Sequence, residues 1–236
     1  MKIVTIIPAY NEEVAIETVV EGALKHSDAI VVDDGSRDNT YNLAKKAGAT
    51  VIKHNKNKGK GAAIKSGLKE GLKNKYDVFI FIDGDGQHDP DNIPLIASHI
   101  NGAKLVVGSR FMEGNPRNMP IQRRLSNKIT TNLIRYVTGY NLTDSQNGFR
   151  ALSRDVANLF VDIKYDDYIY ESEMFYRASK NSIVIEEVPI GCTYGIEKSY
   201  VTKWHVLLYI FFIIRLMFRK LRRRIKTTKN IALNTF

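Results

Sequence analysis

Two carboxylates, Asp83 and Asp85, follow the apolar run 78–82 with one glycine between them. An apolar run of this length is typical of a buried strand, and alternate residues of the extended turn after it can share one cation. Hard divalent ions such as Mg²⁺ and Mn²⁺ take oxygen ligands, few of them from the protein and the rest from water and substrate phosphate. Gln87 adds a neutral oxygen to the same turn. The spacing therefore predicts a site for a divalent cation.

Polar residues also follow three other predicted strands. In a parallel sheet, ligands bind outside the carboxyl ends of the strands, so these turns are where chemistry is expected. The segments are Pro8-Ala9-Tyr10-Asn11-Glu12, Asp33-Asp34-Gly35-Ser36 and Gly108-Ser109-Arg110.

Two polar segments each have two interpretations. The Asp33-Asp34 segment is typical of a turn that caps the helix expected near Asp38, and a carboxylate at that edge can equally bind a nucleobase or ribose. The segment 57–61, Asn-Lys-Gly-Lys-Gly, precedes a predicted helix and can present amides and a lysine to a phosphate. It lacks the Gly and Ser/Thr pattern of a Walker loop. Spacing alone leaves both questions open.

Strands and helices alternate through the first half of the chain. Apolar runs indicate strands at 3–7, 29–32, 50–53, 78–82 and 104–107, and helical patterns occupy 12–25, 38–47, 61–72 and 93–100. This alternation predicts an α/β fold, with a mainly parallel sheet covered by helices on both faces. The pattern is less regular afterwards, with helices expected at 122–137 and 204–224 and strands at 147–152 and 183–188.

The composition is that of an ordinary globular protein, with 236 residues, 44% of them hydrophobic and 25% charged. It excludes a disordered chain, a disulfide scaffold and a protein with several membrane spans. About 200 residues can bury one large core, so we expect one domain with an appendage. The single Cys192 is expected to be a small buried hydrophobe and not a nucleophile.

The net charge of +10 is concentrated at the end of the chain. From Arg215 onward there are eight basic residues and no acidic ones, so the rest of the chain carries only +2. A nucleic-acid-binding domain spreads Lys and Arg over a docking face, often with stacking aromatics between them. We therefore expect no nucleic-acid partner, although salt-sensitive duplex binding by the basic tail is the alternative to test.

The last predicted helix has an apolar first half and a basic second half. Residues 204–214 are eleven mostly apolar residues, too few to span a bilayer, which needs about 20. With Trp204 at one end and cations at the other, residues 204–229 suit a helix that lies on an anionic membrane surface. The alternative is a helix docked on the core with a disordered basic end. We divide the chain into a catalytic domain, 1–202, and a membrane-associating tail, 203–236.

Six motifs, taken in their order along residues 1–199, resemble those of the family 2 glycosyltransferases, most nearly the dolichol-phosphate mannose and glucose synthases. This resemblance implies a GT-A nucleotide-diphospho-sugar transferase fold and an inverting, Mg²⁺- or Mn²⁺-dependent transfer of a hexose. The acceptor would be a polyprenyl (dolichyl) phosphate, and the product a lipid-linked sugar donor for glycosylation. The enzyme would act peripherally on the cytoplasmic face of the cell membrane. The motifs are Pro8-x-Tyr10-Asn11-Glu12, Val32-Asp33-Asp34-Gly35-Ser36, Asn57-x-Gly59-x-Gly61, Asp83-x-Asp85-x-Gln87-His88, Gly108-Ser109-Arg110 and Gly148-Phe149-Arg150.

The resemblance also implies roles for individual residues. Asp85 and Gln87 are the first metal ligands, with Asp83 beside them, and Asp85 and Arg110 serve catalysis. The nucleotide sugar would be held by Pro8, Tyr10, Glu12, Val32, Asp34, Lys60, Asp83, Gly84, Asp85 and Arg110.

No general base is expected, because a phosphate monoester with a second pKa of about 6 is already largely ionised at neutral pH. Cations must instead position the acceptor phosphate, and the resemblance assigns this to Arg123, Arg124, Ser126 and Lys198. A polysaccharide or other hydroxyl acceptor is the alternative. It would require a base, and Asp144 and Glu171 lie near these segments in sequence.

The donor sugar stays open among GDP-mannose, UDP-glucose and UDP-N-acetylglucosamine. Mannose synthases commonly show an arginine shortly before a Gly-x-Ser-Lys stretch, whereas residues 194–200 read Tyr-Gly-Ile-Glu-Lys-Ser-Tyr, in which Lys198 can substitute for that cation. A module that binds a nucleotide sugar without turnover is a further alternative, and the intact Asp83-x-Asp85-x-Gln87 motif argues against it.

Overall fold

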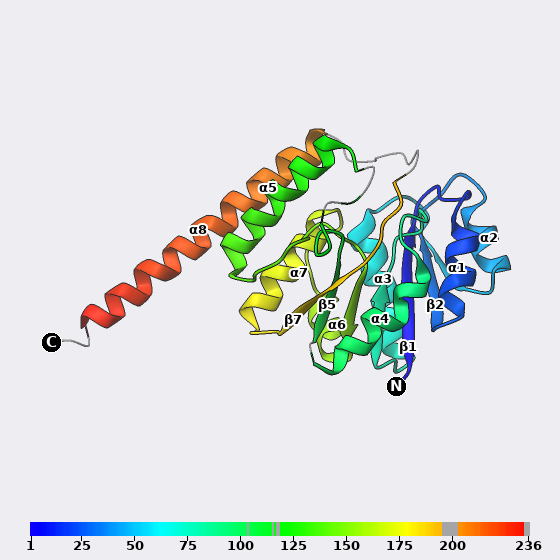
Figure 1. The fold of residues 1–236 in the computed structure, drawn as a ribbon, viewed down its shortest axis with the longest axis horizontal. Coiled ribbons are helices and arrows are strands. Elements are labelled where there is room, and N and C mark those ends of the chain that lie inside the picture. The colour runs from blue at the N-terminus through cyan, green and yellow to red at the C-terminus, as the bar shows by residue number, and fades with distance from the viewer. Residues whose placement is uncertain (103, 115, 117–118, 195–202, 234–236) are drawn as a thin grey trace.

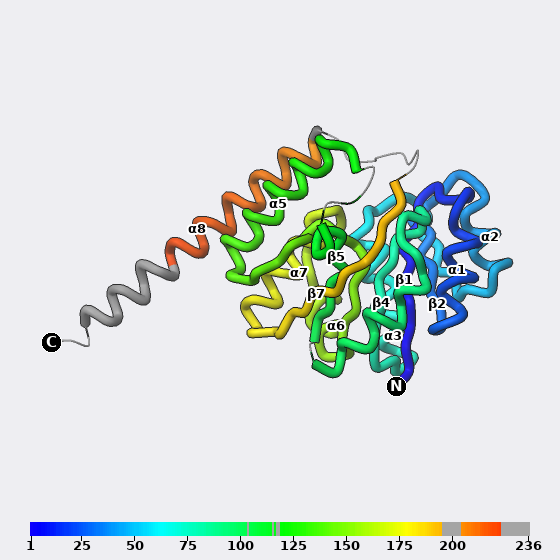
Figure 2. The backbone as a smooth tube through the Cα atoms, viewed as in Figure 1, coloured from blue at the N-terminus to red at the C-terminus, as the bar shows by residue number. Residues whose placement is uncertain are grey.

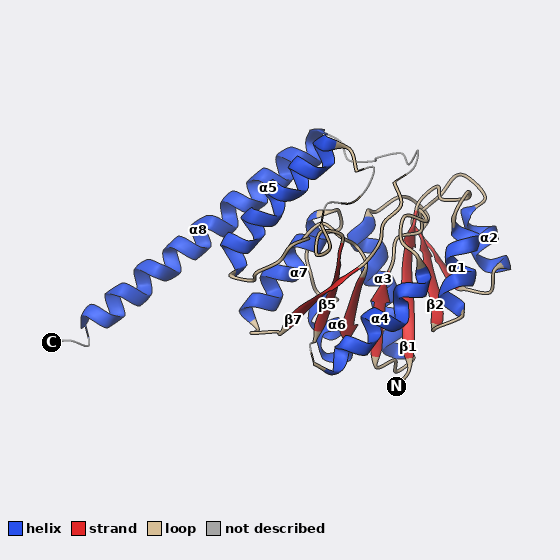
Figure 3. Cartoon of the chain, viewed as in Figure 1, coloured by secondary structure: helices blue, strands red, loops and turns tan. Residues whose placement is uncertain are grey.

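The computed structural model describes residues 1–102, 104–114, 116, 119–194 and 203–233, with the side chains of 203 and 223–233 outside that description. Seven strands form one sheet in the order β3-β2-β1-β4-β6-β5-β7 (Figures 1 and 3). Every neighbouring pair is parallel except that β6 runs antiparallel to both β4 and β5. The strands are β1 (Ile3–Ala9), β2 (Asp28–Asp33), β3 (Thr50–Lys53), β4 (Val78–Phe81), β5 (Leu105–Ser109), β6 (Arg150–Ser153) and β7 (Ile185–Pro189).

The predicted mainly parallel α/β sheet is confirmed, and β6 is the exception that the strand pattern did not anticipate. β6 begins three residues later than expected. Asn147 accepts a hydrogen bond from the amide of Phe149 through its side-chain oxygen, at 3.0 Å, which forms a turn before the strand.

Helices cover both faces of the sheet (Figure 3). Alternate residues of β4 point to opposite faces, with Phe79 and Phe81 in one core cluster and Val78 and Ile80 in the other. The helices are α1 (Ile16–Leu24), α2 (Thr40–Lys46), α3 (Lys60–Lys73), α4 (Ile93–Ser98), α5 (Ile121–Thr138), α6 (Arg154–Phe160), α7 (Ile169–Lys180) and α8 (Lys203–Leu233), with short 3-10 turns at Pro90–Asn92 and His99–Asn101.

The first helix begins four residues later than the predicted 12. Asn11 adopts a positive φ of 57°, and the amide of Glu12 donates to the hydroxyl of Thr40 at 2.8 Å. These two features keep residues 11–12 in a turn, where both side chains face the carboxyl edge of the sheet and not a helix interior. Helices α6 and α7 were not predicted, since the pattern after residue 150 is irregular.

The C-terminal helix lies beside α5, and the two helices begin at the same end of the molecule (Figures 1 and 2). Phe212, Ile213 and Leu216 are buried in the main core cluster, so this helix docks on the core, as one of the two interpretations expected. Its other side chains leave an apolar face in solvent: Trp204, Val206, Leu207, Ile210, Phe211, Ile214, Met217, Phe218 and Leu221. None of the helices in the described part of the chain is long and apolar enough to cross a membrane.

Candidate active site

A cavity of about 1220 Å³ opens at the carboxyl edge of the sheet. Because β1 pairs in parallel with both β2 and β4, the turns after these three strands meet at one place. Of the predicted site residues, the following line the cavity: Pro8, Tyr10, Glu12, Asp34, Lys60, Asp83, Gly84, Asp85, Gln87 and Arg123.

Other predicted residues lie elsewhere. Val32 is fully buried in the core behind the cavity wall. Arg110, Arg124 and Ser126 are not among the residues that line the cavity, and Ser126 is exposed on α5. Lys198 lies outside the described residues.

The carboxylate of Asp34 fastens the glycine-rich loop that precedes α3. It accepts hydrogen bonds from the amides of Lys58, at 3.0 and 3.1 Å, and Gly59, at 2.7 Å. Nδ1 of the buried His54 lies 2.6 Å from the same carboxylate, and Nε2 of His54 lies 2.9 Å from the hydroxyl of Ser66. One interpretation of this loop was that its amides face a phosphate, but the amides of Lys58 and Gly59 bind a carboxylate of the chain itself.

Gly59 must be a glycine for this loop to form. Its φ is +100°, and a Cβ there would lie 2.3 Å from the carbonyl oxygen of Asp166. The amide of Ala62 donates to that same carbonyl at 3.0 Å. The start of α3 is thus packed directly against the segment that leads into α7.

Lys60 joins two carboxylates at the floor of the cavity. Its Nζ lies 2.7 Å from Oδ1 of Asp83 and 3.1 Å from Oε1 of Glu171, which α7 supplies. Burial alone would lower the pKa of this lysine, but the two carboxylates hold it above its ordinary value. The pKa of Asp83 is lowered by the same ammonium against the effect of its burial.

Gly148 allows Asp83 and Lys60 to approach each other. A Cβ at Gly148 would lie 2.8 Å from Oδ2 of Asp83 and 3.0 Å from Nζ of Lys60. This explains in physical terms why a glycine stands in the motif 148–150.

Arg150, from the same motif, is fully buried behind the cavity and binds backbone carbonyls. Its Nε donates to Asn147 at 2.9 Å, its Nη1 to Glu171 at 3.0 Å and its Nη2 to Ser145 at 3.2 Å. Phe175 stacks against the guanidinium, 4.6 Å from its carbon to the ring centroid. Arg150 therefore connects the turn before β6 to the backbone of Glu171, whose side chain pairs with Lys60.

The cavity carries excess negative charge beside Glu12. The pKa of Glu12 is raised to about 7 by burial and then by the charges of Asp85, Asp83 and Asp38. A cation placed among these groups would relieve that repulsion.

Asp85 and Gln87 are adjacent on the cavity wall, and Oδ1 of Asp85 accepts from the amide of Gln87 at 3.0 Å. The segment after β7 packs against them, since the amide of Thr193 donates to the carbonyl of Gln87 at 2.9 Å. Cys192 is half-buried there, with Sγ 3.8 Å from Oε1 of Gln87, and burial raises the pKa of its thiol. Cys192 was expected to be a buried hydrophobe. It is instead half-buried, at the edge of the site.

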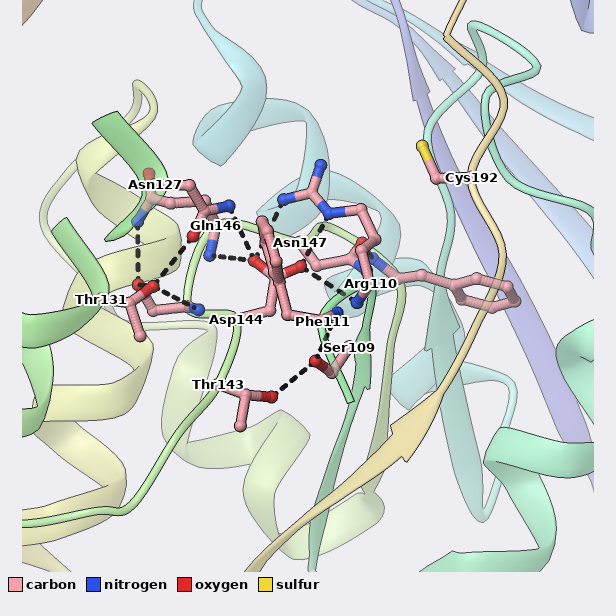
Figure 4. A network of polar contacts seen from close by, with 12 residues as sticks. Ser109, Arg110, Phe111, Asn127, Thr131, Thr143, Asp144, Gln146, Asn147 and Cys192 are labelled. Atoms are coloured by element: carbon pink, nitrogen blue, oxygen red, sulfur yellow. Dashed lines mark hydrogen bonds and ion pairs between the residues drawn. The ribbon is translucent and has the colours of Figure 1, made fainter. Parts of the chain in front are cut away.

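Arg110 forms a two-point ion pair with Asp144, which is fully buried (Figure 4). Nε lies 2.7 Å from Oδ2 and Nη2 lies 3.0 Å from Oδ1. This pairing outweighs the effect of burial and raises the pKa of Arg110. The side-chain amide of Asn127, on α5, donates to the same Asp144 at 2.9 Å. Asp144 therefore connects the end of β5 to the helix that carries the predicted acceptor arginines.

The predicted acceptor residues separate along α5. Arg123 lines the cavity, and its guanidinium carbon lies 5.9 Å from the ring centroid of Tyr194. Nε of Arg124 is buried, and none of the described residues accepts from it. Tyr168, before α7, and His205, in the first turn of α8, complete this side of the cavity. Sequence reasoning missed both, since neither belongs to a motif that follows a strand.

A mainly parallel sheet whose polar turns meet in one cavity at its carboxyl edge, with two carboxylates after the central strand, is the architecture of the GT-A glycosyltransferases. The chain belongs to glycosyl transferase family 2, whose pattern matches residues 4–160. It is therefore a glycosyltransferase, and the resemblance expected from six motifs is confirmed.

Two relatives align with most of the chain. The UDP-N-acetylglucosamine–dolichyl-phosphate N-acetylglucosaminyltransferase of Methanococcus voltae is 37% identical over 214 residues, covering 80% of this chain and 84% of the relative. The undecaprenyl-phosphate mannosyltransferase of Micrococcus luteus is 33% identical over 201 residues, covering 80% and 83%.

Among solved structures, glucosyl-3-phosphoglycerate synthase from Mycobacterium tuberculosis has a similar fold. In its complex with Mn²⁺, UDP and glucosyl-3-phosphoglycerate it aligns with a TM-score of 0.66 at 22% identity, covering 84% of this chain and 73% of that one. The likeness establishes the shared fold.

Proposed function

We propose that this glycosyltransferase moves a hexose from a nucleotide sugar to the phosphate of a polyprenyl phosphate, with inversion at the sugar carbon. The observation that carries the proposal is the cavity itself, in which the carboxylate turns after β1 and β4 face Arg123 of α5. Relatives that transfer sugars to dolichyl and undecaprenyl phosphate support the acceptor class.

Asp85 and Gln87 would hold a divalent cation, Mg²⁺ or Mn²⁺, with Asp83 nearby. Their oxygens are the donors that these ions prefer. Burial and then the charges of Asp85, Asp83 and Asp38 raise the pKa of Glu12, and the clustering of these carboxylates supports a cation site here. Asp85 and Gln87 are adjacent in one turn on the cavity wall, and the ammonium of Lys60 lies 2.7 Å from Asp83, where it would oppose a second cation. When bound, the ion would stabilise the negative charge of the departing nucleoside diphosphate.

The donor's remaining contacts would come from the turns around the cavity. Pro8, Tyr10 and Glu12 lie on one wall, and Asp34 shapes the loop opposite them. We propose that Asp34 acts through this loop, since its carboxylate oxygens accept the amides of Lys58 and Gly59.

A phosphate acceptor is favoured over a hydroxyl acceptor, because both carboxylates that were considered as a general base are engaged in ion pairs. Asp144 is held by two nitrogens of Arg110, and Glu171 by the ammonium of Lys60. A carboxylate occupied in this way is poorly placed to remove a proton from an alcohol. A phosphate acceptor is already ionised and needs only cations such as Arg123 to position it.

The exposed apolar face of α8 would place the enzyme peripherally on the cytoplasmic face of the membrane. Trp204 is 66% exposed and Phe211 is 68% exposed. Arg215, Arg219 and Arg222 surround Phe218 further along the helix and suit anionic headgroups. Ile121, Leu125 and Ile129 add exposed apolar side chains on the neighbouring α5.

The proposal is tested by a transfer assay in vesicles that contain a polyprenyl phosphate, with Mg²⁺ or Mn²⁺. Radiolabelled GDP-mannose, UDP-glucose and UDP-N-acetylglucosamine are offered in parallel, and label in the organic phase with one donor identifies reaction and donor together. Vesicles with the unphosphorylated polyprenol are the matched control. Equal transfer to the polyprenol, or no lipid-linked label from folded protein that binds a nucleotide sugar, would contradict the proposal.

A further inference from the structure

The first turn of α8 forms part of the cavity wall. His205 lines the cavity together with Arg123 of α5 and with Tyr168, which precedes α7. Figure 1 shows why this is possible, since α5 and α8 lie side by side and both begin at the same end of the molecule. A segment expected to be a separate membrane tail thus reaches the site where the sugar would be transferred.

The side chain of His205 is held in a defined orientation. It is half-buried, and its ring meets the ring of Tyr168 edge-on, with centroids 5.5 Å apart and an interplanar angle of 77°. Tyr168 lines the same cavity. An imidazole held in this way can present an N–H group without the entropy cost of ordering a mobile side chain.

His205 also marks the point where the cavity meets the exposed apolar face of α8. The residues on either side of it, Trp204 and Val206, are exposed, and Ile210 continues the apolar face one turn later. The protein surface therefore changes from a polar cavity, lined by Arg123 among others, to an apolar helix face within one residue of His205.

A polyprenyl phosphate has the same change of polarity, because a single charged phosphate ends a long hydrocarbon chain. If the hydrocarbon lies in the bilayer against the apolar face of α8, the phosphate that ends it can enter the cavity at the helix end that carries His205. Arg123 lines the same cavity and supplies positive charge there. A nucleotide sugar has no such chain and would bind among the turns that follow β1, β2 and β4.

We propose that His205 binds the acceptor phosphate, together with Arg123, and that α8 is part of the active site as well as a membrane-docking helix. This inference rests on the proposed function, since it takes a polyprenyl phosphate as the acceptor. It assigns to the tail a role in substrate binding that a simple anchor would not have.

The test compares His205→Ala and His205→Gln with wild type, measuring KM separately for the polyprenyl phosphate and for the nucleotide sugar. Loss of a hydrogen bond to a charged group should raise the acceptor KM about tenfold in the alanine variant. The glutamine variant, which keeps an N–H donor, should recover part of this. The donor KM should change less than about twofold, within the scatter expected when no contact is lost. His99→Ala is the matched control, because His99 pairs with Glu186 outside the cavity.

A short-chain, water-soluble polyprenyl phosphate separates phosphate binding from membrane docking. Because His205 would contact the phosphate, the alanine variant should lose the same factor with the soluble acceptor as with vesicles, and it should sediment with vesicles as wild type does. A loss confined to vesicles, a raised donor KM with an unchanged acceptor KM, or no change at all would overturn the proposal. Thermal unfolding of each variant checks that the fold is intact.

Failure of the proposed function would be recognised separately, as wild-type protein that forms no lipid-linked product with any donor. Calorimetry with the short-chain polyprenyl phosphate alone then still tests His205. Binding that is about tenfold weaker in His205→Ala supports the inference, and equal affinity, or none in either protein, refutes it.

Discussion

The ammonium of Lys60 lies 2.7 Å from a carboxylate oxygen of Asp83, at the point where the turn after β4 meets the first residue of α3. Glu171 approaches the same ammonium from α7, at 3.1 Å. Three segments that are distant in sequence are therefore connected by one partly buried cation. The two carboxylates of the Asp83-x-Asp85 motif therefore have different surroundings, because Asp83 lies against the ammonium of Lys60 and Asp85 accepts the amide of Gln87.

Replacing Lys60 with methionine should destabilise the fold by about 3 kcal/mol at neutral pH, because two carboxylates lose the cation between them. Urea unfolding measures this. Lys73→Met is the matched control, since Lys73 is 74% exposed and pairs with Glu70 at 3.5 Å, and it should cost less than about 1 kcal/mol.

The loss of stability caused by Lys60→Met should become smaller at low pH. Lys60 lowers the pKa of Asp83, so the stabilisation is present above the ordinary carboxyl pKa of 3.8 and is lost as pH falls. The difference between wild type and Lys60→Met should therefore shrink as the pH is lowered below that value, through the lowered pKa of Asp83. A difference that stays constant with pH would show that the pair contributes little.

Substituting alanine for Asp85 or Gln87 should abolish transfer while leaving the thermal unfolding midpoint near that of wild type, because these side chains would hold the cation and not the core. Steady-state transfer rates provide the measurement. Asp91→Ala serves as the control, since Asp91 is exposed and pairs with His26 at 2.8 Å. Wild-type rates in either Asp85→Ala or Gln87→Ala would eliminate the metal assignment.

Metal binding should release protons and strengthen as pH rises toward about 7. The pKa of Glu12 is raised to about 7 by burial and then by the charges of Asp85 and Asp83, so a cation beside these carboxylates should lower the pKa again. A protonated Glu12 must then lose its proton when the ion binds below that pH. Calorimetry with Mn²⁺ in buffers of different ionisation enthalpy detects the proton. The release should vanish in Glu12→Gln, and an unchanged release in that variant would contradict this account.

Removing the carboxylate of Asp144 should impair both stability and transfer. Asp144→Ala removes the carboxylate that pairs with Arg110, at a cost of about 3 kcal/mol, and also removes the acceptor of the Asn127 side-chain amide on α5. Asp144→Asn keeps the size of the side chain and should show a smaller loss of stability with a reduced kcat, since α5 carries Arg123. Asp155→Asn is the control, because Asp155 is 82% exposed. A kcat unaffected by Asp144→Asn would show that this connection does not position α5 for transfer.

Much of the site could be predicted from local sequence. The strand at Thr50–Lys53 was confirmed at both ends, and β4 at Val78–Phe81 within one residue. A buried strand and the polar turn after it are patterns of adjacent residues, and parallel pairing then brings several such turns to one edge. The places of Tyr10, Glu12 and Asp85 on the cavity wall follow from this rule.

The sequence determined the strands, the polar turns and the family motifs, because each is a local pattern of side-chain type and spacing. The tertiary structure decided which charges meet. Arg110 and Asp144 are 34 residues apart, and their pairing depends on β6 being inserted antiparallel between β4 and β5. Likewise, the local sequence of α8 indicates a separable tail, but Phe212 and Leu216 are buried against the core, and this packing brings His205 to the cavity. Ion pairs and docked helices depend on distance and burial in space, and neither quantity is encoded in the spacing of neighbouring residues.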